Sequence, residues 1–160
     1  MGNRSIWLIA ALAGLSVLFL ATGIYAGKDV ADKFGIATEG CENTKGIVEF
    51  DHKTHSEDYA KAYPELYKNG CGDCHHDDKG KPLTDLKAGD EVKKCFDCHN
   101  KCGEPPKGKD APKLSKAEEL AYIAEAFHEN CRDCHRDYQK MTKKRNAPTT
   151  CTKCHPREKK

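Results

Sequence analysis

The sequence predicts a small domain that is mainly helical and irregular, with little β-structure, behind one apolar helix at the amino terminus. Three observations support this prediction. The long apolar run of the 160-residue chain is confined to residues 6–26, charged residues make up 32% of the chain, and ten residues are cysteine. Outside the apolar run, Leu, Ile, Val and Phe are too few for their burial to offset the conformational entropy lost on folding. Something other than side-chain packing must therefore hold the domain together.

The amino-terminal segment, residues 1–26, predicts a membrane anchor. Residues 6–26 carry no charge, and a helix of about 20 residues spans a hydrocarbon core of roughly 30 Å. Arg4 precedes the run and places the amino terminus in the cytoplasm, so that all later residues are exported. A cleaved signal peptide is the alternative, but the run exceeds its usual apolar length of about 7–15 residues, and the cleavage points after Gly23 and Ala26 are imperfect. We expect a retained anchor.

The exported part divides into a linker, residues 27–46, and a domain, residues 47–160, with a strand or loop leading from one into the other. A short helix is expected around residues 59–67, where Pro64 either stays in the first turn or splits the helix. The clearest helix follows Ser115, which forms a Ser-x-x-Glu capping box with Glu118. Its apolar residues recur at roughly helical spacing: Leu114, Leu120, Ala121, Ile123, Ala124 and Phe127.

The motif Cys-x-x-Cys-His occurs four times and is the attachment signature of c-type haem. Two cysteines on one helical turn can each add to a vinyl group of the porphyrin, and the next histidine then faces the iron. Zinc is the alternative for such cysteine pairs, but zinc does not require a histidine after each pair. We therefore expect four covalently bound haem c groups, which build the core of a multihaem cytochrome fold. The predicted attachment residues are Cys71, Cys74, Cys95, Cys98, Cys131, Cys134, Cys151 and Cys154, and the proximal iron ligands are His75, His99, His135 and His155.

Four further histidines remain once the four proximal ligands are subtracted from the total of eight. They are His52, His55, His76 and His128. Each alone could be an ordinary surface residue, yet their number equals that of the haems, which favours two histidine ligands on every iron. An iron with two imidazole ligands has no open position, so it exchanges electrons rather than binding a substrate.

These motifs resemble the class III cytochromes c, the tetrahaem periplasmic electron carriers of sulfate-respiring bacteria. The resemblance covers roughly residues 47–157 and rests on order: the segment Val48–His55 with its His-x-x-His pair, a Cys-x-x-Cys-His-His site, a second site, a lone histidine, and two more sites. It implies that His52 is the distal ligand of the first haem, His76 of the second, His55 of the third and His128 of the fourth. Members of this family often have four residues between the cysteines of the second and fourth sites, whereas this chain has two.

The resemblance also implies the partners and the location of the chain. Residues 136–160 hold nine Lys or Arg against two acidic residues, and they match the lysine-rich surface on which the family's redox partners dock. We expect a hydrogenase or formate dehydrogenase and a membrane respiratory complex as partners, at the periplasmic side of the cytoplasmic membrane. A net charge of +2 gives no indication of nucleic acid, and no small-molecule substrate is expected. The alternatives are a multihaem reductase with one open haem, and a haem wire of polymerised subunits.

Two cysteines, Cys41 and Cys102, lie outside the haem motifs. In an exported protein, two leftover cysteines most often pair. Free or intermolecular thiols and an unusual iron ligand remain open as alternatives at this point.

Overall fold

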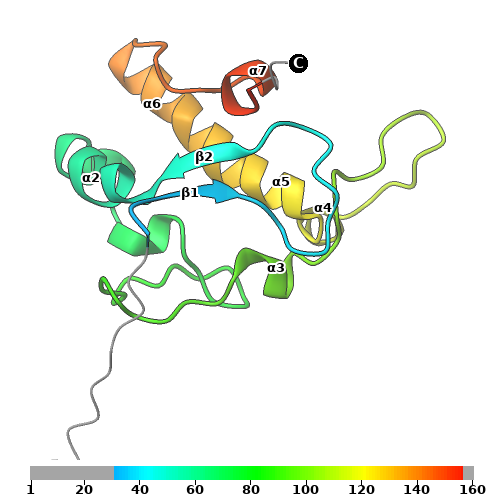
Figure 1. Cartoon of the computed structure of the whole chain (residues 1–160), viewed down its shortest axis with the longest axis horizontal. Coiled ribbons are helices and arrows are strands. Elements are labelled where there is room, and N and C mark those ends of the chain that lie inside the picture. The colour runs from blue at the N-terminus through cyan, green and yellow to red at the C-terminus, as the bar shows by residue number, and fades with distance from the viewer. Residues whose placement is uncertain (1–30, 157–160) are drawn as a thin grey trace, which may run out of the picture.

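The computed structural model describes residues 31–156, and a two-stranded hairpin begins this part of the chain (Figure 1). Strand β1 (Lys33–Ile36) pairs antiparallel with β2 (Val48–Asp51), so that Phe34 lies opposite Phe50. Their rings meet edge to face at 5.5 Å. β1 lies within residues 27–46, which the sequence assigned to a linker. Its pairing with β2 makes part of that stretch a strand of the hairpin.

A helical run follows β2 without a loop. The carboxylate of Asp51 accepts a hydrogen bond from the Thr54 backbone N–H at 2.9 Å and pairs with Lys33 at 2.9 Å. These two contacts lower the pKa of Asp51 to about 2, the Thr54 bond contributing most. The run comprises a π-helical segment η1 (Thr54–Tyr59) and α2 (Ala60–Ala62). Two 3-10 helices follow, η2 (Pro64–Leu66) and η3 (Gly70–Asp73), and Pro64 does split the helix expected here.

The second half of the domain is the more helical. It contains α3 (Cys95–Cys98), α4 (Lys116–Leu120), α5 (Ile123–Phe127), the π-helical η4 (His128–Asp133), α6 (Cys134–Thr142) and α7 (Cys151–Cys154). The capping box predicted for Ser115 and Glu118 is confirmed at the start of α4. The single helix expected there is interrupted at Tyr122. The backbone of this residue is extended and forms a parallel bridge with Lys101. From Ile123 onward, α5, η4 and α6 follow one another without interruption (Figure 1).

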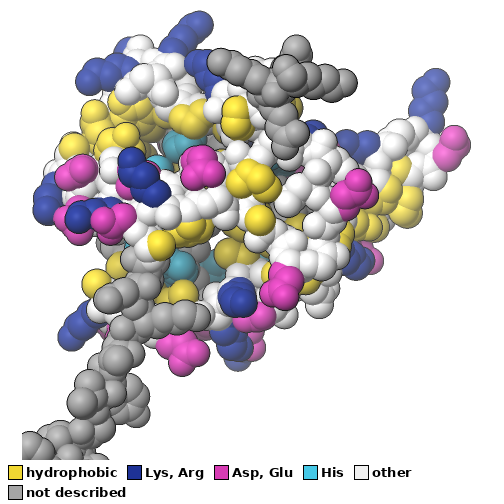
Figure 2. Space-filling model, viewed as in Figure 1, with side chains coloured by type: hydrophobic (Ala, Val, Ile, Leu, Met, Phe, Trp, Pro, Cys, Tyr) yellow, Lys and Arg dark blue, Asp and Glu magenta, His cyan; other side chains and the backbone are white. Residues whose placement is uncertain are grey.

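Side chains of residues 31–156 build almost no apolar core. Ile123, 5% exposed, is the one buried hydrophobic residue in this part of the chain. Histidine side chains can be seen from outside, at the bottom of openings in the surface (Figure 2). The small irregular fold with some helix and little β-structure agrees with the prediction. No helix among the described residues is long and apolar enough to cross a membrane, and residues 6–26 lie outside the described part.

A disulfide between Cys41 and Cys102 connects the loop after β1 to the segment after α3. It resolves the three alternatives for these cysteines in favour of pairing, which leaves neither thiol as an iron ligand. An ion pair between Lys45 and Glu104, at 2.9 Å, joins the same two segments.

Candidate haem sites

Each Cys-x-x-Cys-His motif is folded as a single turn, and we number the four sites in chain order. Sites 2 and 4 are the short helices α3 and α7, site 1 lies on η3, and site 3 spans η4 and the start of α6. In sites 1, 2 and 4, the histidine N–H donates to the carbonyl of the first cysteine, at 2.9, 2.9 and 2.7 Å. The histidine thus follows the two cysteines around one turn, and all eight motif cysteines are free of disulfides.

Three pairs of histidine rings lie close together at similar separations. The ring centres of His55 and His135 are 6.2 Å apart, those of His76 and His99 are 5.9 Å apart, and those of His128 and His155 are 6.5 Å apart. A transition metal held at about 2 Å from a nitrogen of each ring places the two ring centres roughly 6 Å apart. The three separations are therefore wide enough for a metal to be held between the two imidazoles of each pair.

The fourth predicted pair, His52 and His75, is placed less closely. The ring of His52 lies 6.1 Å from that of Phe50, and no ring pair of comparable separation joins it to His75 among the described residues. His52 nevertheless lies near His75. Burial is the main cause that lowers the pKa of His75, and the charge of the nearby His52 lowers it further. Site 1 is thus the site at which the chain has the least complete ligand geometry.

Backbone carbonyls fix the rings of five histidines through the Nδ1 atom. Because a carbonyl only accepts, Nδ1 carries the proton and Nε2 is left free to bind a metal. The hydrogen bonds run from His55 to Asp51 (2.8 Å), His76 to Asp77 (2.7 Å), His99 to Leu120 (2.5 Å), His135 to Pro148 (2.7 Å) and His155 to Gly46 (2.8 Å). Such a bond orients a metal-binding imidazole and raises its basicity.

The protonation of the buried rings also suits a metal ligand. Burial is the main cause that lowers the pKa of His75, His128 and His135. A lowered pKa keeps an imidazole neutral at neutral pH, and the neutral imidazole is the form that binds a metal. No group of three or more His, Cys, Asp or Glu within residues 31–156 could hold a metal ion by itself, as a zinc site requires.

Arg132 provides an independent indication of a missing carboxylate. Its Nε is enclosed by the surrounding residues and has no hydrogen-bond partner, although Asp133 lies at 3.6 Å. A buried guanidinium N–H without an acceptor is costly, and a carboxylate is its best partner. Haem carries two propionate carboxylates, and Arg132 lies within the motif of site 3, close enough to His128 to lower the pKa of that ring. The residues present therefore fit haem.

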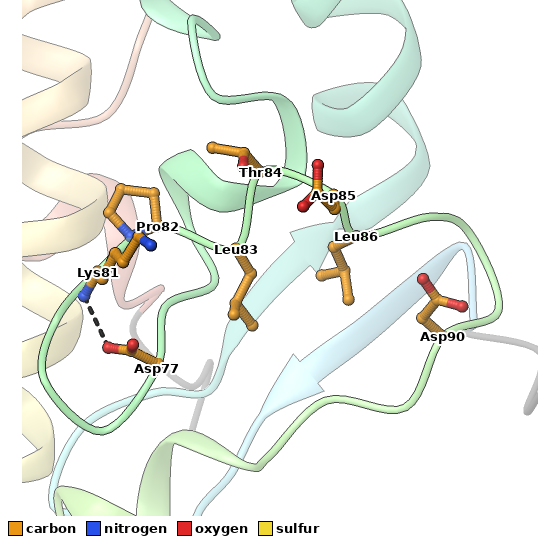
Figure 3. Close-up of a pocket in the computed structure, with 8 residues that line it drawn as sticks. All are labelled: Asp77, Lys81, Pro82, Leu83, Thr84, Asp85, Leu86 and Asp90. Atoms are coloured by element: carbon orange, nitrogen blue, oxygen red, sulfur yellow. Dashed lines mark hydrogen bonds between the residues drawn. The ribbon is translucent and has the colours of Figure 1, made fainter.

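An open hollow lies beside site 1 (Figure 3). Its volume is about 350 Å³, within the range of roughly 300–1,000 Å³ that cofactor sites occupy. Leu83 and Leu86 supply its apolar side, and the Leu83 N–H donates to the carbonyl of His75 at 3.0 Å. The carboxylate of Asp77 closes the preceding turn by accepting from the Lys79 and Lys81 N–H groups. Gly72 lies so close to Leu83 that a Cβ would meet its backbone nitrogen at 2.9 Å.

The sequence analysis missed Arg132 and the residues whose carbonyls hold the rings, Gly46 among them. Gly46 supplies the carbonyl that holds His155, and the two residues are 109 positions apart in the chain. Arg132 lies between two motif cysteines, a position at which any residue type is allowed. Nothing in the sequence distinguishes Gly46 from the other glycines of the chain.

One of the comparisons with known proteins identifies a family for this chain. The model of the Class III cytochrome C family matches residues 29–155. Neither the curated proteins nor the solved structures contain a significant match. Class III cytochromes c are periplasmic electron carriers and not enzymes, and the four cysteine pairs of this chain correspond to four covalently attached haem c groups. The chain therefore belongs to the class III cytochrome c family.

Proposed function

We propose that this chain is a tetrahaem electron relay in which every iron has two histidine ligands. The observation that carries the proposal is the set of three close ring pairs, because each places a motif histidine next to one of the remaining histidines. His55 then serves the third haem, His76 the second and His128 the fourth. By the same logic His52 serves the first haem, supported by its closeness to His75.

The residues of the chain would determine how electrons move. Each haem supplies one reversible electron, and the two imidazoles leave no position for a substrate. Four haems within one small domain lie close enough for the charge on one to change the reduction of the next. The backbone carbonyls at Nδ1 hold the rings in place, so that little rearrangement accompanies the transfer of each electron.

Carbon monoxide tests the ligand assignment. The dithionite-reduced protein is expected to contain four haems per chain and to show an unchanged absorption spectrum when CO is added, because no iron has an open position. Haem per chain is counted on the same sample. If about a quarter of the haem binds CO, one iron is open, and site 1 is the first candidate because its ring pair is the least complete.

The proposal extends to location and partners. Residues 6–26 would anchor the relay at the periplasmic side of the cytoplasmic membrane. Membrane fractionation of the expressed chain tests this, and recovery in the soluble fraction would contradict it.

The partners would be a periplasmic hydrogenase or formate dehydrogenase and a membrane respiratory complex. Their docking surface would include a hollow of about 490 Å³ lined by Arg136, Gln139, Lys140, Lys143 and Arg145. Four cationic side chains around one hollow favour an acidic partner.

Reversing two of these charges is expected to weaken docking. In the variant Lys143→Glu/Arg145→Glu, the KM for reduction by a purified hydrogenase should rise roughly tenfold at low ionic strength, because attraction to an acidic partner becomes repulsion. The difference should shrink as salt screens the charges. A variant with the same change in net charge elsewhere, Lys79→Glu/Lys87→Glu, serves as the control. An equal rise in both variants would mean that net charge, and not this surface, governs docking.

A further inference from the structure

Two contacts of different chemistry join the loop after β1 to the segment after α3. The Cys41–Cys102 disulfide brings the two Cα atoms to 5.5 Å, and Lys45 pairs with Glu104 at 2.9 Å. Lys107 also contacts Glu104, at 2.7 Å. The two lysines, Lys107 first, lower the pKa of Glu104 to about 2, so its carboxylate stays charged over the physiological range.

The loop side of this connection leads directly to His155. Gly46 follows Lys45, and its carbonyl accepts the Nδ1–H of His155 at 2.8 Å. The backbone here lies against Pro156 so closely that a Cβ on Gly46 would collide with the Pro156 carbonyl oxygen. The position of Gly46 therefore decides where the His155 ring is held.

The other side of the connection leads to His128. The segment that carries Cys102 runs along the start of α5 through three backbone hydrogen bonds: Lys101 N–H to Ala121 (2.9 Å), Ile123 N–H to Lys101 (2.9 Å) and Ala124 N–H to Gly103 (3.2 Å). Ile123 is the buried hydrophobic residue of the described chain. α5 then continues into η4, which begins at His128.

These contacts link His155 to His128 through Gly46, the disulfide and α5. We propose that the Cys41–Cys102 disulfide and the Lys45–Glu104 ion pair act as one clamp that holds Gly46 against His155, and so sets the reduction potential of the fourth haem. This inference rests on the proposed assignment of His128 and His155 as the ligands of that haem. Gly46 is then a positioning residue, because its carbonyl accepts the hydrogen bond from Nδ1–H of His155, and this hydrogen bond makes the imidazole more basic. A more basic ligand stabilises the ferric iron and lowers the potential.

The test is a potentiometric titration of the variant Cys41→Ser/Cys102→Ser, with each haem followed by its assigned methyl resonances in NMR spectra. We expect the potential of the fourth haem to rise and those of the other three to stay within error. The variant Gly46→Ala keeps the disulfide but displaces the carbonyl, and it should raise the same potential.

Gln139→Ala is the matched control. Gln139 donates to the carbonyl of Ala147 at 2.8 Å and so steadies the loop whose next residue, Pro148, accepts the Nδ1–H of His135. This variant loosens an equivalent carbonyl at the third haem and should leave the fourth unchanged. A fourth-haem shift in Gln139→Ala as large as in the double serine variant would indicate general loosening and would overturn the clamp.

A second measurement does not require the serine variant to mature. The disulfide of the mature protein is reduced with a phosphine, alkylated and freed of reductant, while the thioether bonds to haem remain. A rise of the fourth potential alone supports the clamp, and four unchanged potentials overturn it. CO binding at the fourth haem of the unmodified protein would instead overturn the assignment of its ligands, so the two failures are distinguishable.

Discussion

A chain made without haem is expected to be unfolded. Ordering the backbone of residues 31–156 costs conformational entropy, which buried apolar surface must offset. Ile123 is the one buried hydrophobic residue in this part of the chain, so apolar burial offsets almost none of that cost. The disulfide spans 61 residues and contributes about 4 kcal/mol by restricting the unfolded chain, which is far too little. We therefore expect the haems to supply the buried surface that the side chains lack.

The measurement is circular dichroism during heating of two samples, one matured with haem and one expressed without haem attachment. The matured protein should show a cooperative transition, and the haem-free chain should show none. Counting free thiols controls the second sample, because an intact Cys41–Cys102 bond leaves eight of the ten cysteines reactive. A sharp transition in the haem-free chain would show that side chains do build a core.

Replacing His55 with alanine is expected to open the third haem and not the first, although the first motif is much nearer in sequence. The ring of His55 faces His135 at 6.2 Å and is held by the carbonyl of Asp51. Without it, the third iron becomes five-coordinate, so about a quarter of the reduced haem should bind CO. His52→Ala, three residues away, should produce the same amplitude at the first haem.

Removing the third haem distinguishes the two variants. In a chain with Cys131→Ala/Cys134→Ala, the His55→Ala change should no longer add CO binding, because its haem is absent. His52→Ala should still add it. The opposite pattern would mean that His52 serves the third haem and His55 the first, and it would contradict the ring geometry.

The local features of this fold could be predicted from the sequence, because they depend on neighbouring residues. The capping box at Ser115, the turn that carries each cysteine pair and the interruption at Pro64 all appear in the structure. The break at Tyr122 could not be predicted. It arises because Lys101, 21 residues earlier, takes the backbone bonds that would have continued the helix.

The candidate sites likewise combine features that could be predicted from the sequence with features that could not. The motif cysteines and histidines are evident as residue types at fixed spacing, and counting favoured two histidines per iron. Which histidine faces which motif depends on long-range contacts, and only the resemblance to a family suggested it. The carbonyls that orient the rings could not be predicted at all, because every residue has one, and Gly46 reaches His155 across most of the domain.

Under the proposed pairing, three short covalent segments connect the haems into a linear order. The adjacent histidines at 75 and 76 join the first haem to the second, and the pair at 52 and 55 joins the first to the third. The helical run from His128 to His135 joins the fourth to the third. The order is therefore second, first, third, fourth. Loss of either inner haem would divide the conducting path, whereas loss of an end haem would shorten it and leave the rest connected.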